Sequence, residues 1–223
     1  MRGLPAALLL DLDGTLVDSE PIHRAAYQAF FAERGWDVGD LALFTGRRAA
    51  DVFDSAPGPW SGGDPVALAA AVVSCIPPGA VPAPIEGARA LVEAAAAAGV
   101  QVAVVTSAGP EWAERSLADA LGVRRHVHVI VTGDEVVDGK PDPAGFALAC
   151  ERLGVSAADC IAVEDSPAGA AAALAAGVVN VYGLSTTHPS QALTDAGATE
   201  VYADLAGFAV RIGLTGRRPP PSP

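Results

Sequence analysis

Carboxylate side chains follow several short apolar runs in this 223-residue chain. Asp11 and Asp13 come after the first run, two residues apart, and Glu164 and Asp165 are adjacent at the end of a later one. If these four carboxylates meet in the folded protein, they repel one another unless some are protonated or a divalent cation lies among them. Oxygen ligands without clustered cysteine or histidine favour a hard ion, and the ion expected here is Mg²⁺.

A hydroxyl and an ammonium group complete the candidate set. Thr106, followed by Ser107, ends another apolar run, and Lys140 is the single lysine of the chain, in the loop sequence DGKPDP. A cation, an ammonium and a hydroxyl together can neutralise the oxygens of a phosphate as it is transferred. A carboxylate screened in this way can attack phosphorus, and a second carboxylate two residues on can protonate the leaving oxygen and later activate water. The residues therefore indicate phosphoryl-transfer chemistry.

Alternating strands and helices are expected to position these side chains. Five apolar runs of strand length predict strands at residues 6–12, 100–106, 127–132, 160–164 and 178–182. Helical spacing predicts helices at residues 84–98, 111–121, 143–153 and 167–176, with Pro at or near each start and Gly just past each end. This alternation predicts an α/β fold with a doubly wound parallel sheet, whose ligands bind outside the carboxyl ends of the strands. The candidate side chains should then converge on one edge of the sheet.

Residues 17–83 interrupt the alternation. They contain helical stretches at 22–33 and 64–75 but no convincing strand, and their C-terminal side is rich in Gly and Pro, as hinges are. We therefore expect a helical cap at 17–83, inserted into a core domain formed by residues 1–16 and 84–214. The last segment, 215–223, reads TGRRPPPSP and is predicted to be disordered.

Four motifs, in this order along the chain, resemble those of the haloacid dehalogenase superfamily, whose members are mostly phosphohydrolases. They are DLDGTLVDS at 11–19, VAVVTS at 102–107, GKPDP around Lys140, and VEDSPAG from Val163. With a helical cap between the first two, the resemblance covers about residues 8–182. It implies a doubly wound core of the same kind as the one that the alternation predicts.

The resemblance also implies catalytic and metal-binding roles for the matching residues. Asp11 would be the nucleophile and Asp13 the general acid and base. Asp11, the backbone carbonyl of Asp13, and Asp165 would bind Mg²⁺, with Glu164 as a further ligand or as the partner of one. A simpler reading of Glu164 and Asp165, which can hold at the same time, is that they cap the helix that begins near residue 166.

Phosphate-binding roles follow from the same motifs. The Thr106 hydroxyl, the backbone amide of Ser107 and Lys140 would hold the phosphate, and Gly14 would permit the tight turn that brings backbone amides to the site. The cap would close over the substrate, expel water and provide selectivity.

A branch of the superfamily is indicated by DSEPIH and a later TGR, which resemble β-phosphoglucomutase and small sugar-phosphate phosphatases. His23 and Arg47 align with cap residues of that branch, which implies contact with the substrate. A structural imidazole would explain His23 nearly as well, and Arg47 beside Arg48 can also be read as a solvated pair.

One departure favours hydrolysis over internal transfer. The mutase has a Ser-Lys-Asn run that contacts the sugar phosphate, whereas this chain has Ala108, Gly109 and Pro110 there, and its cap has no lysine. Both changes remove side chains that could bind a second phosphate. The expected activity is Mg²⁺-dependent hydrolysis of a small phosphomonoester, such as a sugar or polyol phosphate, through an aspartyl-phosphate; the alternative is a phosphomutase.

Composition limits the partners and the compartment. The formal charge of −12 repels polyanions, so nucleic acid is not the expected partner. Three cysteines without CxxC spacing argue against a disulfide framework or a zinc site and suit a reducing compartment. No uncharged run is long enough for a bilayer, and no cleavage site follows the apolar start. We expect a cytoplasmic protein with no membrane partner. The sequence leaves the oligomeric state open, with a monomer slightly favoured.

Three rival functions fit the sequence less well. Signalling receiver domains use similar residues, but they are shorter, lack a large helical insertion and carry the acceptor aspartate on a middle strand. A carbon-halogen hydrolase needs no acid at Asp13, because halide leaves unprotonated. A binding protein that kept only the fold would not need the complete motif set.

Overall fold

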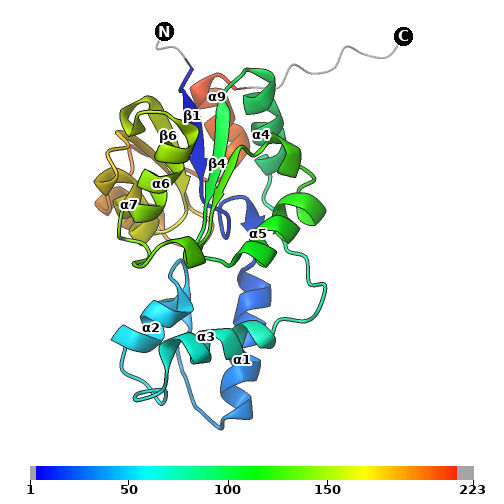
Figure 1. Ribbon diagram of the computed structural model, residues 1–223, viewed down its shortest axis with the longest axis vertical. Coiled ribbons are helices and arrows are strands. Elements are labelled where there is room, and N and C mark those ends of the chain that lie inside the picture. The colour runs from blue at the N-terminus through cyan, green and yellow to red at the C-terminus, as the bar shows by residue number, and fades with distance from the viewer. Residues whose placement is uncertain (1–3, 215–223) are drawn as a thin grey trace.

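The computed structural model describes residues 4–214, and the predicted disorder of 215–223 lies outside them. Six parallel strands form one sheet in the order β5-β4-β1-β6-β7-β8 (Figure 1). The strands are β1 (Ala7–Leu10), β4 (Gln101–Val105), β5 (Val129–Val131), β6 (Cys160–Glu164), β7 (Asn180–Leu184) and β8 (Glu200–Tyr202). The expected doubly wound α/β fold is confirmed.

The central strand β1 is fully buried because helices cover both faces of the sheet. Leu8 and Leu10 point into one apolar layer and Ala7 and Leu9 into the other, as the two-residue period of a strand requires. Three helices contribute to the first layer: α4 (Ala88–Ala97), α5 (Pro110–Arg115) and α9 (Leu205–Ile212). Two helices contribute to the second: α6 (Ala144–Leu153) and α7 (Pro167–Ala175). Helix α8 (Ser190–Asp195) lies beside α7 and β7.

Several predicted boundaries differ from those in the structure. The fifth predicted strand begins two residues too early, because the amide of Val178 donates to the carbonyl of Ala173 and so completes the end of α7. Strand β8 was not predicted, since three residues are too short to show a period. The predicted helix 111–121 is α5 followed by a π-helical turn at Ser116–Ala120. Short 3₁₀ turns occur at Ala42–Phe44, Arg124–His126, Gly133–Glu135 and Ala157–Asp159.

The helices between residues 20 and 74 form a separate helical layer below the sheet in Figure 1. Its helices are α1 (Glu20–Glu33), α2 (Ala49–Ser55) and α3 (Pro65–Ser74). They enclose an aromatic cluster of their own, which includes Phe30, Phe31, Phe44, Phe53 and Trp60. We call this unit the cap.

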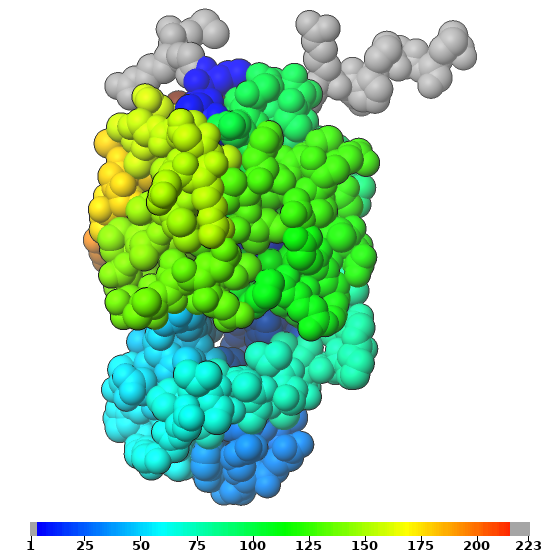
Figure 2. Space-filling view, in the orientation of Figure 1, coloured from blue at the N-terminus to red at the C-terminus, as the bar shows by residue number. Residues whose placement is uncertain are grey.

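The expectation that this interval has no strand is wrong at its ends. Strand β2 (Val17–Asp18) pairs antiparallel with β3 (Ala83–Pro84), so the two linkers between cap and core lie side by side. Two-residue strands have no readable period, and Pro84, predicted as the start of a helix, belongs to β3 instead. Figure 2 shows a hollow where the cap meets the core. Among residues 4–214, no helix is long and apolar enough to span a membrane.

Candidate active site

The candidate residues gather at the carboxyl edge of the sheet because their strands are neighbours. Strand β1 pairs in register with β4 on one side and β6 on the other, matching Leu10 with Val104 and Val163. The chain then continues into Asp11 after β1, Thr106 after β4 and Asp165 after β6. The sheet therefore brings together side chains that are 59 to 154 residues apart in sequence.

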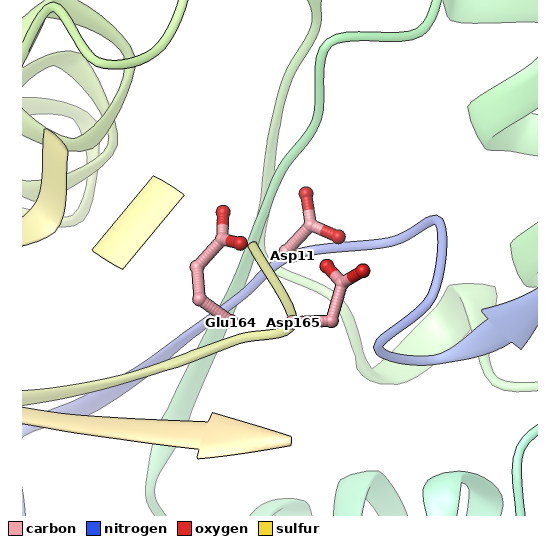
Figure 3. Close-up of side chains that lie close together, drawn as sticks. All are labelled: Asp11, Glu164 and Asp165. Carbon is pink, nitrogen blue, oxygen red and sulfur yellow. The ribbon is translucent and has the colours of Figure 1, made fainter. Parts of the chain in front are cut away.

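Three buried carboxylates form the centre of the site. Asp11, Glu164 and Asp165 each offer an oxygen, and these oxygens lie within 4.8 Å of one another (Figure 3). Burial raises the pKa of Asp11 well above its usual value; Lys140 opposes this effect, and the charges of Glu164 and Asp165 add to it. Burial, followed by the charge of Glu164, raises the pKa of Asp165 to about 7. Without a cation, this cluster resists full ionisation.

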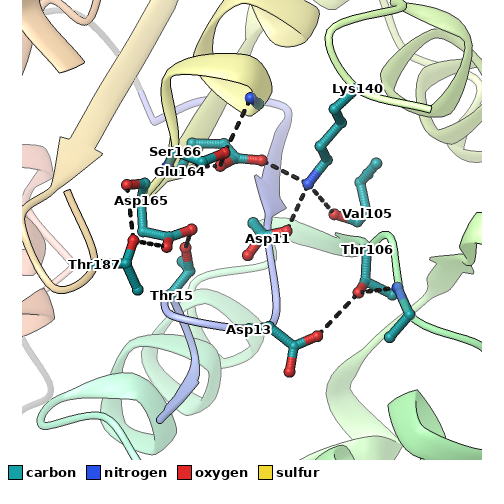
Figure 4. Close-up of polar contacts among 12 residues, drawn as sticks. Asp11, Asp13, Thr15, Val105, Thr106, Lys140, Glu164, Asp165, Ser166 and Thr187 are labelled. Carbon is teal, nitrogen blue, oxygen red and sulfur yellow. Dashed lines mark hydrogen bonds and ion pairs between the residues drawn. The ribbon is translucent and has the colours of Figure 1, made fainter. Parts of the chain in front are cut away.

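Lys140 is the positive charge within the cluster. Its Nζ lies 2.5 Å from Asp11 Oδ1, 2.5 Å from Glu164 Oε1 and 2.9 Å from the carbonyl oxygen of Val105 (Figure 4). Its side chain is only 8% exposed. Burial alone would lower the pKa of Lys140, but Asp11 and Glu164 raise it above its ordinary value. All three ammonium protons thus have acceptors, and the group stays charged.

The other oxygen of Asp11 suits a cation. Asp11 Oδ2 is buried and has no hydrogen-bond partner among the described residues. A buried carboxylate oxygen without a donor is costly, and a hard divalent ion bound by carboxylate oxygens would satisfy it. The donor set therefore fits Mg²⁺.

Glu164 has both oxygens occupied. Oε1 accepts from Lys140, while Oε2 accepts from the Ser166 hydroxyl at 3.0 Å and from the Ser166 amide at 3.2 Å. Ser166 also caps α7, since its hydroxyl oxygen accepts the amide proton of Gly169. Ser166, and not Glu164 or Asp165, therefore caps this helix.

Asp165 is held by residues that the sequence did not single out. The Thr15 hydroxyl donates to Asp165 Oδ1 at 3.3 Å, and the Thr187 hydroxyl donates to Oδ2 in a short hydrogen bond. Gly14 has a φ of +86°, and a Cβ there would overlap the Asp165 carboxylate. A glycine is thus required at this turn, and Thr15 and Thr187 lie too far from Asp165 in sequence for spacing to reveal them.

Asp13 lies on the other side of the turn, beside α5. Its Oδ1 accepts the indole N–H of Trp112 at 2.8 Å, and its Oδ2 faces the Thr106 hydroxyl at 3.4 Å. The Thr106 oxygen in turn accepts the amide of Ala108 at 3.0 Å. Trp112 was not among the predicted site residues, because no spacing connects it with Asp13.

A cavity of about 1040 Å³ opens over these residues and is lined by both cap and core. His23 lines it from α1, with its ring centroid 5.1 Å from that of Trp112. Arg47 and Ser107 also line it, and Arg47 donates to the Ser55 hydroxyl at 3.3 Å. The structure thus brings the predicted residues of both units to one cavity, except Lys140 and Glu164, which do not line it.

Arg48, not Arg47, bridges the cap and the core. Its guanidinium pairs with Asp51 and donates to the carbonyl oxygens of Gly133, Val136 and Val137 at 3.0, 3.1 and 2.8 Å. The alternative interpretation of the two arginines as a solvated pair is therefore wrong for Arg48. One residue of the cap is tied to three carbonyls of a core loop.

The chain belongs to the haloacid dehalogenase-like hydrolase family, whose model matches residues 5–177. The resemblance that the four motifs indicated is thereby confirmed.

Its relatives include several phosphatases. The chain is 36% identical over 192 residues to validoxylamine A 7'-phosphate phosphatase of Streptomyces hygroscopicus subsp. limoneus, covering 84% of this chain and 89% of the relative. It is 32% identical to a phosphoglycolate phosphatase of Xylella fastidiosa, covering 82% of each chain. Among solved structures, a variant of CbbY from Rhodobacter sphaeroides in complex with xylulose-(1,5)bisphosphate superposes with a TM-score of 0.77 at 26% identity, covering 91% of this chain and 96% of that one.

Proposed function

We propose that this hydrolase is a Mg²⁺-dependent phosphatase that works through an aspartyl-phosphate on Asp11. Its enzyme class, a hydrolase of phosphoric monoesters, is confirmed by the family and by the phosphatases among its relatives. The observation that carries the mechanism is the state of Asp11: Lys140 holds one carboxylate oxygen, and the other is buried without a donor. This carboxylate is oriented, screened by one positive charge and placed at the floor of a large cavity.

The first half of the reaction transfers the phosphoryl group to Asp11. An Asp11 oxygen attacks phosphorus, the ester P–O bond breaks, and Asp13 gives its proton to the leaving oxygen. Thr106, the Ser107 amide and Lys140 bind the phosphate oxygens, Lys140 by exchanging one of its three present acceptors for a phosphate oxygen, and Gly14 gives the turn its shape. Bound to Asp11, Asp165 and the Asp13 carbonyl, Mg²⁺ would supply charge neutralisation at the transferring group.

The second half returns the enzyme to its starting state. Asp13, now a carboxylate, takes a proton from a water molecule, and that water attacks phosphorus and releases Asp11. We assign Glu164 to Lys140 and not to the cation, since both of its oxygens already have partners.

Hydrolysis is favoured over mutase activity by the charges around the cavity. Four arginines line it, and three of them are paired with carboxylates: Arg24 with Glu20, Arg48 with Asp51 and Arg115 with Glu111. Only Arg47 among these four has an uncharged partner, the Ser55 hydroxyl. A second phosphate would therefore find little free positive charge.

The substrate we propose is a sugar or polyol monophosphate. The names of the phosphatases among the relatives indicate phosphorylated small molecules as their substrates. A cavity of about 1040 Å³ has room for a sugar-sized group beyond the phosphate. We assign His23 and Arg47 to that group, and we propose that residues 17–83 act as the cap that closes over it.

The setting we propose is a monomer in the cytoplasm. One chain supplies both walls of the cavity, so no second copy is needed to complete the site. Cys75, Cys150 and Cys160 are free thiols, which suits a reducing compartment.

Phosphate release from a panel of sugar and polyol phosphates, with Mg²⁺ or with a chelator, tests this function. We expect turnover only with Mg²⁺, and none from Asp11→Asn, which removes the nucleophile with little change in volume. Asp119→Asn, at an exposed position, is the matched control and should keep full activity. Substantial turnover by Asp11→Asn would refute the nucleophile. Isomerised sugar phosphate with little free phosphate would show a mutase instead.

A further inference from the structure

We propose that Trp112 is a positioning residue for Asp13: its indole N–H holds Oδ1, so that Oδ2 is the oxygen that carries the transferable proton. This inference rests on the proposed acid and base role of Asp13. The Trp112 Nε1–Asp13 Oδ1 distance of 2.8 Å is that of a good hydrogen bond. Both side chains are half-buried, so water competes with this contact less than it would on an open surface.

The two oxygens of Asp13 are held unequally. The Thr106 hydroxyl donates to Oδ2 over the longer distance of 3.4 Å, while its oxygen accepts the amide proton of Ala108 at 3.0 Å. The short bond to Trp112 therefore fixes one oxygen, while the long one leaves the other available to a substrate. Because an indole is only a donor, Oδ1 must act as an acceptor, and the proton of the neutral carboxyl falls on Oδ2.

Proton transfer then has a defined route. In the first step the Oδ2 proton moves to the leaving oxygen as the ester P–O bond breaks and the Asp11–phosphorus bond forms. In the second step Asp13 regains a proton from the attacking water as the Asp11–phosphorus bond breaks. Trp112 stays bonded to Oδ1 throughout and neither gives nor takes a proton.

The fold holds the indole rigidly in this place. Trp112 is in the first turn of α5, directly after Pro110 and Glu111, and it packs against the apolar layer that contains Leu8 and Leu10. Its other neighbour is His23 of α1, at a centroid distance of 5.1 Å. The ring thus lies between the proton donor and the cap, on an element that does not belong to the cap.

Two substitutions separate the hydrogen bond from the bulk of the ring. Trp112→Phe keeps an aromatic ring and removes the donor, whereas Trp112→His keeps a ring N–H two bonds from Cγ, as in indole, and removes the second ring. We expect Trp112→Phe to lower kcat for alkyl phosphates on the order of tenfold, with little change in KM. The loss should be much smaller for p-nitrophenyl phosphate, whose leaving group needs no proton. Trp112→His should retain more alkyl phosphatase activity than Trp112→Phe.

A purely structural role would produce a different pattern. The inference would be overturned if Trp112→Phe lost activity equally on both esters or kept full activity on alkyl phosphates. It would also be overturned if Trp112→Phe were more active on alkyl phosphates than Trp112→His. Trp60→Phe is the control, because it removes an indole N–H bonded to the Ala56 carbonyl inside the cap, at 2.9 Å. It should leave the dependence on the leaving group unchanged.

Asp13→Asn distinguishes the two levels of the proposal. If Asp13→Asn loses activity equally on alkyl phosphates and on p-nitrophenyl phosphate, the proposed role of Asp13 itself is wrong. If Asp13→Asn loses more activity on alkyl phosphates but Trp112→Phe does not, only the inference about Trp112 is wrong. The indole N–H signals in the NMR spectrum of the otherwise native protein give a second test that needs no Trp112 variant. Asp13→Asn should shift one of the three signals strongly, and three unmoved signals would contradict the hydrogen bond.

Discussion

At the scale of single residues, the site is a problem of charge balance. Three buried carboxylates each have an oxygen within 4.8 Å of the others, and burial has already raised the pKa of two of them. Lys140 neutralises only part of this charge, through Asp11 and Glu164. A divalent cation would balance the remainder, which makes the stability of the protein depend on both metal and pH.

We predict that Mg²⁺ raises the melting temperature more at about pH 8 than at about pH 5.5. The folded-state pKa values of Asp11 and Asp165 lie above the unfolded value of about 4, so the metal-free protein binds more protons folded than unfolded. The contribution of these two carboxyls to stability is therefore complete below about pH 4 and is lost as the pH rises through about 7, the pKa of Asp165. Mg²⁺ competes with these protons, and its binding recovers the stability that is lost at high pH. Scanning calorimetry at both pH values, with Mg²⁺ or chelator, measures this; an equal gain at both would contradict it.

At the scale of elements, the cavity depends on contacts between the cap and two core loops. Arg48, at the start of α2, donates to the loop at Gly133, Val136 and Val137. Gly46, with a φ of +72°, approaches Ser166 so closely that a Cβ would lie 2.6 Å from the Ser166 Cβ. The cap therefore rests on the core at two points, beside the loop that leads to Lys140 and beside the start of α7.

We predict that Arg48→Met raises KM by roughly tenfold and changes kcat less. Methionine keeps much of the apolar stem but loses the donors to three carbonyls, so the closed arrangement is weakened while the groups around Asp11 remain in place. Steady-state kinetics on the preferred substrate measures this effect. Arg125→Met, which removes the same charge from an exposed position, should behave like the native enzyme. An unchanged KM would show that Arg48 does not hold the cap.

At the scale of the whole molecule, the chain contains separate apolar cores. The cap has its own aromatic cluster, and the sheet has one layer on each face. The cap and core are joined through the paired linkers β2 and β3. This arrangement allows the cap to lose its packing before the sheet does.

We predict that Phe30→Ala destabilises the cap by about 3–5 kcal/mol and leaves the sheet folded. Phe30 is fully buried at the centre of the cap cluster, which also holds Trp36 and Trp60, two of the three tryptophans. Tryptophan fluorescence should then change at a lower temperature than far-UV circular dichroism, which the larger core dominates. Phe146→Ala, in the layer under the sheet, should lower the circular dichroism transition instead. Coincident transitions in Phe30→Ala would show that cap and core unfold as one unit.

Much of the fold could be predicted because its signals are local. Apolar β-branched runs, helical spacing and Pro or Gly at helix ends depend on residues a few positions apart, and they predicted five of the six strands of the sheet. The convergence of Asp11, Thr106 and Asp165 followed from the rule that parallel strands end at one edge. The family and the class of hydrolase are confirmed, and the catalytic roles of these residues stay predictions.

What the sequence alone determined is which stretches form strands and helices and which charged groups follow them, since periodicity and burial act along the chain. Only the tertiary structure decided that Trp112 contacts Asp13 from 99 residues away, that Thr15 reaches Asp165 across 150, and that Arg48 rather than Arg47 ties the cap to the core. Such contacts depend on loop paths and side-chain rotamers, which no local pattern encodes. They form only when the layers pack, because packing brings side chains that are distant in sequence within hydrogen-bonding distance.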